Sequence, residues 1–155
     1  MLKSIEGNFD HPEVNELLTK HFIELRAASP EGSAHVLDIP GLKIPSIKFW
    51  SLWEDGKLLG CGALKFLECG HGEFKSIRVH DNFRNKGNGI KVINHLIDEA
   101  KKLKIKRLSI ETGAGKFFEP ARKLFKECNF ELTKPFAHYK EDENSIYLTK
   151  LINND

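Results

Sequence analysis

Residues 84–89 read RNKGNG and separate a strand-like run, HGEFKSIRVH, from an amphipathic helical pattern. At a strand-to-helix turn, glycines let the backbone approach a ligand closely, and the free N–H groups at the positive end of the helix attract an anion. The stretch therefore predicts an anion-binding loop. The spacing of its residues decides which kind of loop it is.

Two common phosphate-binding loops have a different spacing. A P-loop requires G-x-x-x-x-G-K-[ST], and this pattern occurs nowhere in the chain. A dinucleotide-binding loop requires Gly or Ala three residues after Gly89, where this chain has Val92. The sequence therefore argues against nucleoside triphosphates and against NAD.

The chain alternates strand-like and helical patterns without a repeat or a linker, so we expect one domain over residues 1–155. Hydrophobic periodicity predicts the order β-α-β-β-β-α-β-α-β-β. Asp55-Gly56 predicts a two-residue type I′ hairpin, and Asp10 with Glu13 predicts a capping box at the first helix. This order indicates an α/β fold in which a mixed, mostly antiparallel sheet carries helices on both faces.

Composition limits the partners. The chain has 24 Lys+Arg and 22 Asp+Glu, a net charge of +2, which gives no electrostatic basis for binding nucleic acid or an anionic membrane. No apolar run reaches the roughly 18 residues of a membrane span, and the N-terminus lacks a signal-peptide pattern, so we expect a cytoplasmic protein. Three cysteines without a C-x-x-C pattern predict no zinc site or other metal centre, and we expect Cys61, Cys69 and Cys128 to be reduced packing residues.

Arg84, Gly87 and Gly89 form the pattern R-x-x-G-x-G, preceded at a fixed distance by Ile77 and Val79. This pattern resembles the acetyl-CoA pyrophosphate loop of the GNAT superfamily of N-acetyltransferases. The resemblance covers nearly the whole chain, including the segments FWSLWEDGKLLGCGAL, GEFKSIRV and ETG and a helix that ends in NF where the superfamily commonly has GF. Within the superfamily the chain resembles a small set of acetyltransferases with RAxSP and FAxYxEDxNS segments, here residues 26–30 and 136–145.

The resemblance implies the GNAT acyl-CoA N-acyltransferase fold, in which the strands containing residues 77–79 and 108–112 splay apart and leave a wedge for pantetheine. Acetyl-CoA would then be the co-substrate, with its diphosphate on the loop and its pantetheine amides paired with the backbone of the first of these strands. The residues implied to bind it are Ile77, Arg78, Val79, Arg84, Asn85, Lys86, Gly87, Asn88, Gly89 and Ile90.

The implied reaction is direct attack of a primary amine on the thioester, which requires a general base for the ammonium proton. Glu73 lies where many GNAT enzymes carry a catalytic glutamate, and Glu111 ends the neighbouring strand. We favour Glu73 slightly as the base. Four histidines remain alternatives, namely His35, His71, His80 and His138.

The general acid is the main departure from the family. Many members place a tyrosine four residues before the terminal Gly-Phe pair, and here Phe125 stands at the corresponding position. Tyr139, in the FAHY segment, is the proposed substitute that protonates the leaving thiolate, and water is the alternative donor.

The acceptor is expected to be a small molecule or an amino-acid-like amine. In the superfamily the first helices and the loop after them line the acceptor site, which makes Arg26 and His35 candidates for contacting it. Arg26 would bind a carboxylate of the acceptor. A protein or peptide amine as acceptor and a non-catalytic acetyl-CoA-binding module remain alternative functions, and the chain is expected to be a monomer or a homodimer.

Overall fold

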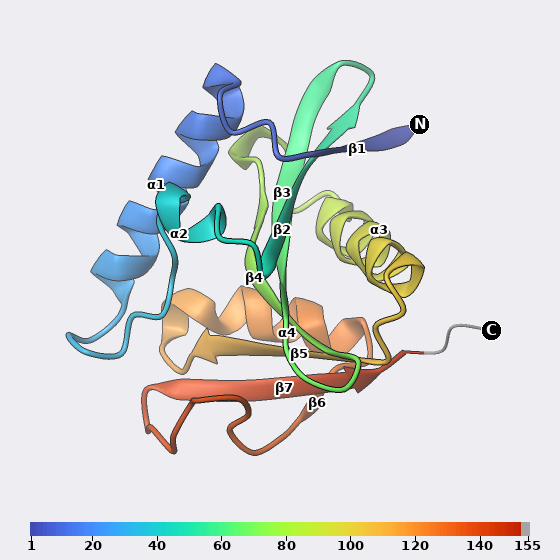
Figure 1. Cartoon of the computed structure of the whole chain (residues 1–155). Helices are drawn as coiled ribbons and strands as arrows, with labels where there is room; N and C mark the ends of the chain where they lie inside the picture. The colour runs from blue at the N-terminus through green and yellow to red at the C-terminus, as the bar shows by residue number, and fades with distance from the viewer. Residues whose placement is uncertain (153–155) are drawn as a thin grey trace.

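The computed structural model describes residues 1–152, and Figure 1 shows one sheet with helices on both of its faces. The sheet has seven strands in the order β1-β2-β3-β4-β5-β7-β6, with β4 and β5 parallel and all other neighbours antiparallel. The strands are β1 (Leu2–Glu6), β2 (Ile47–Glu54), β3 (Lys57–Phe66), β4 (His71–Val79), β5 (Arg107–Gly113), β6 (Glu131–Leu132) and β7 (Ser145–Leu151). The helices are α1 (Pro12–Ala28), α2 (Ile39–Leu42), α3 (Asn88–Lys102) and α4 (Glu119–Glu127), with 3-10 turns η1 (Asp81–Phe83) and η2 (Lys116–Phe118). The predicted fold class and element order are confirmed.

The predicted hairpin turn is confirmed, whereas the predicted cap of α1 is wrong. Asp55 and Gly56 both have positive φ, 52° and 77°, as a type I′ turn requires. Helix α1 begins at Pro12, and His11 is its N-cap, whose Nδ1 accepts a hydrogen bond from the Glu13 N–H at 3.2 Å. Because proline favours the first helical position, the residue just before it becomes the cap, and Asp10 lies one residue too early.

Two hydrophobic clusters lie on opposite faces of the sheet. On one face, α3 and the end of α4 pack on the strands through a cluster that includes Ile93, Leu96, Phe125 and Phe130. On the other face, α1 and α2 pack through a cluster that includes Leu18 and Leu42. No helix within residues 1–152 combines the length and apolar character needed to cross a membrane.

Two expectations about packing side chains are corrected. Ile90, predicted to lie on the inward face of α3, is 38% exposed, because the first turn of that helix opens onto a cavity instead of the sheet. Cys69 is exposed in a turn with φ of 58°, so it is not a packing residue. Cys61 and Cys128 are buried and free, as expected, and burial raises the pKa of the Cys61 thiol to about 12.

Strands β4 and β5 separate part of the way along their length. They pair only over residues 71–73 and 107–109, although β4 continues beside β3 and β5 continues beside β7. In Figure 1, β2, β3 and β4 run upright while β5 and β7 run across the molecule. A β-bulge places Ser76, with φ of 53°, and Ile77 opposite the single residue Gly62 of β3. The edge of β4 beyond Glu73 therefore has no strand partner on the β5 side among the described residues.

Candidate active site

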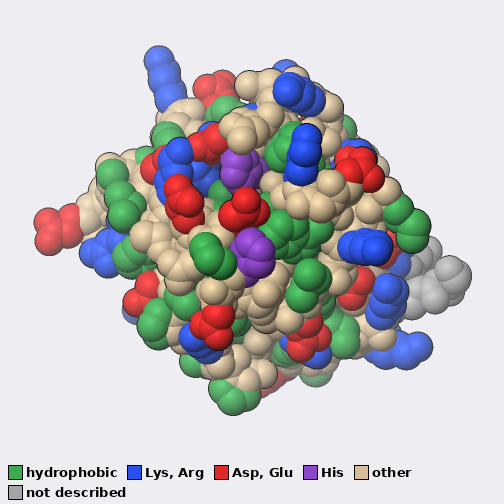
Figure 2. Space-filling view, turned by 90° about the horizontal axis from the view of Figure 1, so that it is seen from above, with side chains coloured by type: hydrophobic (Ala, Val, Ile, Leu, Met, Phe, Trp, Pro, Cys, Tyr) green, Lys and Arg blue, Asp and Glu red, His purple; other side chains and the backbone are tan. Residues whose placement is uncertain are grey.

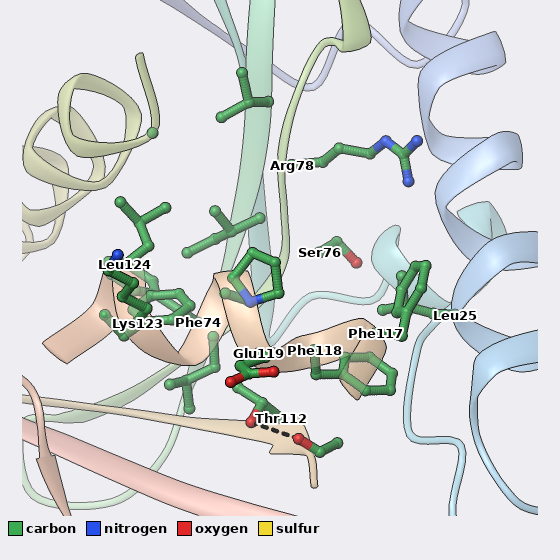
Figure 3. Close-up of a pocket in the computed structure, with 18 of the residues that line it drawn as sticks. Leu25, Phe74, Ser76, Arg78, Thr112, Phe117, Phe118, Glu119, Lys123 and Leu124 are labelled. Carbon is green, nitrogen blue, oxygen red and sulfur yellow. Dashed lines mark hydrogen bonds between the residues drawn. The ribbon is translucent and has the colours of Figure 1, made fainter. Parts of the chain in front are cut away.

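A cavity of about 850 Å³ opens where β4 and β5 separate (Figure 3). Its walls come from β4 and β5, from α1 and the loop after it, from the loop before α3, and from η2 and α4. Ligand pockets typically enclose about 300–1,000 Å³, so this cavity has room for a large ligand. Its position coincides with the wedge that the sequence resemblance implied.

The RNKGNG loop contributes one end of the cavity. Gly87 is the N-cap of α3 in a left-handed conformation, with φ of 79° and ψ of 2°, and a Cβ added there would meet nothing within 4 Å. The open space beside this cap is where an anion at the N-terminus of α3 would lie. The loop residues that line the cavity are Arg84, Asn85, Gly87, Gly89 and Ile90.

Two predicted loop residues are turned to other partners. Lys86 is not among the lining residues, and its Nζ donates to the Asn82 carbonyl oxygen at 3.4 Å. Asn88 does not line the cavity either, because its Nδ2 donates to the Phe83 carbonyl oxygen at 2.9 Å. These side chains shape the loop, and only their backbone N–H groups remain candidates for contacting an anion.

Gly89 has a packing role that the sequence did not reveal. A Cβ at this position would lie 2.6 Å from Leu124 Cδ2. The absence of a side chain therefore lets α4 pack against the first turn of α3. Leu124 itself lines the cavity (Figure 3).

Glu73, Lys75 and Tyr139 form a buried polar cluster. The Tyr139 hydroxyl donates to Glu73 Oε2 at 2.5 Å, and Lys75 Nζ lies 3.3 Å from the same oxygen and 3.1 Å from the phenol oxygen. Burial and then the Glu73 carboxylate raise the pKa of Tyr139. Glu73 lines the cavity, and its Oε1 is buried without a hydrogen-bond partner in the described part of the chain.

The position of Tyr139 corrects its predicted role. Tyr139 does not line the main cavity but a smaller one of about 470 Å³, together with His35 and His138. Its hydroxyl hydrogen is already given to Glu73. The structure therefore does not place this phenol where it would protonate a leaving thiolate directly, while Phe125, which has no hydroxyl, lines the main cavity.

Glu111 lies on the β5 wall of the cavity with a strongly perturbed carboxyl group. Burial raises its pKa from 4.5 to about 7, although a hydrogen bond from Ser145 Oγ to Oε2 at 2.8 Å acts in the opposite direction. A carboxylate with a pKa near neutrality can take up a proton at neutral pH, as a general base must.

The two acceptor-site candidates from the sequence have different positions. His35 lines the cavity, and its ring is nearly perpendicular to that of Tyr139, at 85°, with centroids 5.1 Å apart. Arg26 is exposed, lies over the Phe22 ring at 5.4 Å, and does not line the cavity. The structure therefore leaves Arg26 without the predicted position at the acceptor site.

Arg78 and His21 form a cluster whose side-chain positions the sequence did not indicate. Arg78 was predicted only as part of the cofactor strand, but its side chain extends from β4 toward α1 (Figure 3). Its Nη2 donates to Glu24 Oε1 at 3.0 Å and to Asp81 Oδ1 at 3.2 Å, and its Nη1 reaches His21 Nδ1 at 3.5 Å. Burial, followed by the charge of Arg78, lowers the pKa of His21 to about 3, so this imidazole is neutral.

Two of the other predicted histidines, His71 and His80, have structural partners. His71 Nε2 lies 2.6 Å from Ser109 Oγ, and burial lowers its pKa. His80 caps η1 by accepting from the Asn82 N–H at 3.1 Å. Neither lines the main cavity.

Two further features concern surface charge and possible metal ligands. Acidic and basic side chains are interspersed on the face shown in Figure 2. Within residues 1–152 no three His, Cys, Asp or Glu side chains are grouped so that they would hold a metal ion.

Comparison with known proteins places this geometry in a family. Residues 12–130 match the model of the acetyltransferase (GNAT) family. Over 138 residues the chain is 45% identical to the uncharacterized N-acetyltransferase YsnE of Bacillus subtilis (strain 168), covering 89% of this chain and 91% of that protein. It is 37% identical to the uncharacterized N-acetyltransferase YedL of Escherichia coli (strain K12), covering 90% and 87%. The chain belongs to the acetyltransferase (GNAT) family.

A solved structure has the same fold. The crystal structure of a Bacillus subtilis acetyltransferase in complex with CoA superposes with a TM-score of 0.68 at 17% sequence identity, covering 99% of this chain and 100% of that one. The resemblance stated from the sequence and the fold class it implied are therefore both confirmed.

Proposed function

We propose that this protein transfers the acetyl group of acetyl-CoA to the primary amine of a small, amino-acid-like molecule. The observation that carries the proposal is that one cavity contains the open N-cap of α3, the unpaired edge of β4 and two carboxylates. The family and the CoA complex of the related Bacillus subtilis acetyltransferase support acetyl-CoA as the acyl donor.

The chain offers suitable groups for each part of CoA. The backbone N–H groups at the start of α3 and the Arg84 guanidinium are the groups for the diphosphate. The unpaired edge of β4 around Ile77 and Val79 provides backbone groups for the pantetheine amides, as an added strand would use them. Bound in this way, acetyl-CoA supplies a thioester in the wedge between β4 and β5.

We propose that Glu111 is the general base. Its pKa of about 7 leaves a substantial fraction of it ionised at neutral pH and still basic enough to remove an ammonium proton. Glu73 Oε2 is already bonded to Tyr139 and Lys75, which leaves only its buried Oε1 without a partner, so we assign this carboxylate mainly to holding the polar cluster together. We therefore prefer Glu111 to Glu73 as the base, whereas the sequence slightly favoured Glu73.

We propose that water protonates the leaving thiolate. Phe125 has no proton to give, and the hydroxyl of Tyr139 points to Glu73 from outside the main cavity. An ordinary thiol has a pKa of about 8.5, so protonation of the thiolate by solvent is favourable at neutral pH.

A thiol-release assay with acetyl-CoA and a panel of amines tests the proposal. Glu111→Gln should reduce turnover by roughly 10²-fold or more, the size expected for loss of a general base, with CoA affinity unchanged. Glu73→Gln should have a smaller effect on turnover, and Glu68→Gln, at an exposed turn position, is the matched control. A larger loss in Glu73→Gln than in Glu111→Gln would return the role of base to Glu73.

The same assay separates the alternative functions. Turnover with peptides but not with free amines would indicate a protein or peptide acetyltransferase. Binding of CoA without turnover of any amine would indicate a non-catalytic module.

A further inference from the structure

Two buried polar groups on the α1 side of the cavity have no hydrogen-bond partner among the described residues. They are Arg78 Nε and Ser76 Oγ, both from β4, and both residues line the cavity. Arg78 is only 4% exposed. Figure 3 shows the two side chains extending from β4 toward α1. Buried donors without partners are costly, so the pair indicates a ligand group that accepts hydrogen bonds at this position.

His21 adds a third donor to this wall. An arginine cannot accept a hydrogen bond, so His21 Nδ1 is the acceptor for Arg78 Nη1. In a neutral imidazole the hydrogen is then on Nε2, which makes that nitrogen a donor. His21 lines the same cavity from α1.

The Arg78 guanidinium is held in place by a network of ion pairs. Three cations, Lys20, Arg78 and Arg84, share the two carboxylates of Glu24 and Asp81. Because both Nη2 hydrogens of Arg78 are given to these carboxylates, its Nε–H, which has no partner among the described residues, is the donor left for a ligand. A hydrogen bond from a guanidinium N–H to a carboxylate is charge-assisted, and is therefore stronger than one between neutral groups.

We propose that Arg78, Ser76 and His21 form a subsite for the carboxylate of the acceptor, which makes the substrate an amino acid or a similar amine bearing a carboxylate. This inference rests on the proposed acetyltransfer. Ser76 lies in the bulge directly before Ile77, so the carboxylate would sit beside the segment of β4 proposed to pair with pantetheine.

The test compares amines that differ in one group. Free amino acids, their carboxamides and the corresponding decarboxylated amines are assayed with acetyl-CoA by thiol release, and an aminoalkylphosphonate is included to distinguish a carboxylate from another anion. We expect kcat/KM to be highest for the carboxylates, by roughly 10- to 100-fold over the carboxamides, the size of a lost charge-assisted hydrogen bond.

Variants assign the preference to the subsite. Arg78→Met and Ser76→Ala should raise KM for the carboxylate substrate and leave KM for the decarboxylated amine nearly unchanged. Arg78→Lys keeps the charge but loses Nε, so it should recover only part of the affinity. Lys20→Met removes a cation from the same ion-pair network, yet Lys20 does not line the cavity, so this control should keep the preference.

CoA binding, measured by thermal shift on every variant, separates the two proposals. If CoA stabilises the protein but carboxamides and decarboxylated amines are used as well as carboxylates, the subsite is wrong and the acetyltransferase proposal stands. A preference for the phosphonate, or an equal loss on all acceptors in Arg78→Met, also overturns the carboxylate assignment. If CoA does not stabilise the wild-type protein, the proposed function fails.

Discussion

Replacing Glu111 by Gln should stabilise the protein, and the gain should depend on pH. Glutamine has the shape of the protonated carboxyl group and keeps an oxygen that can accept the Ser145 hydrogen bond. The native pKa of about 7 lies about 2.5 above the ordinary value of 4.5. At ~1.36 kcal/mol per pKa unit, ionising the buried side chain costs the native state about 3 kcal/mol.

The sign follows from proton binding. Between pH 4.5 and about 7 the native state binds the Glu111 proton more tightly than the unfolded state does, so the stability that this group contributes is full at low pH and is lost as pH rises. Glu111→Gln has no ionisable group at this position, so it does not lose stability in this pH range. Its advantage in the free energy of unfolding should therefore be small near pH 4.5, grow through pH 6, and level off above about pH 7.

Urea denaturation at a series of pH values measures this difference directly. Glu68→Gln, at an exposed position, controls for removal of one negative charge. A difference between wild type and Glu111→Gln that stays the same from pH 5 to pH 8 would refute the raised pKa, and with it the physical basis for Glu111 as the base.

Three further predictions concern the cofactor loop and the polar cluster. Gly87→Ala and Gly56→Ala each place a side chain at a left-handed position with open space around it, so both should lose about 1–2 kcal/mol of stability. Only Gly87→Ala should weaken CoA binding, measured by calorimetry. Equal CoA affinity in the two variants would show that the anion site does not lie at the start of α3. Gly89→Val should lower the melting temperature even without CoA, because the Cβ of the valine would lie 2.6 Å from Leu124 Cδ2. An unchanged melting temperature would argue against the close packing of Leu124 on Gly89. Tyr139→Phe should lower the free energy of unfolding, measured by urea denaturation, by about 1–3 kcal/mol, because it removes a buried hydrogen-bond donor to Glu73, and CoA affinity should be retained. Tyr147→Phe, which loses a hydrogen bond to the Lys140 carbonyl oxygen, is the comparison. An unchanged free energy of unfolding in Tyr139→Phe would contradict the polar cluster.

Local signals in the sequence predicted most of the fold. The hairpin at Asp55-Gly56 follows from the dihedral angles that its turn requires, and the left-handed start of α3 at Gly87 follows from the glycine in the loop before it. The cap of α1 was missed by one residue, because the position of Pro12 outweighed the capping-box pattern at Asp10. Local rules thus fixed the elements but not every boundary.

The directions in which side chains point within the cavity depend on tertiary structure, so local sequence patterns did not predict them. The β-bulge at Ser76 determines where the Arg78 side chain points, and no residue spacing in the sequence predicts that bulge. Tyr139 was predicted as the proton donor to the thiolate, but its position outside the main cavity depends on how the segment before β7 folds over Glu73. Arg26 was predicted at the acceptor site because the first helices line that site in the superfamily, yet in α1 its side chain is exposed and does not line the cavity.

Calorimetric titration of CoA into the wild-type protein is the measurement that tests the central claim most directly. The account predicts that one CoA binds per chain with micromolar affinity, that acetyl-CoA binds similarly, and that ATP and NAD give no comparable binding. Absence of CoA binding, or tighter binding of ATP or NAD than of CoA, would contradict the assignment of this cavity to an acyl-CoA.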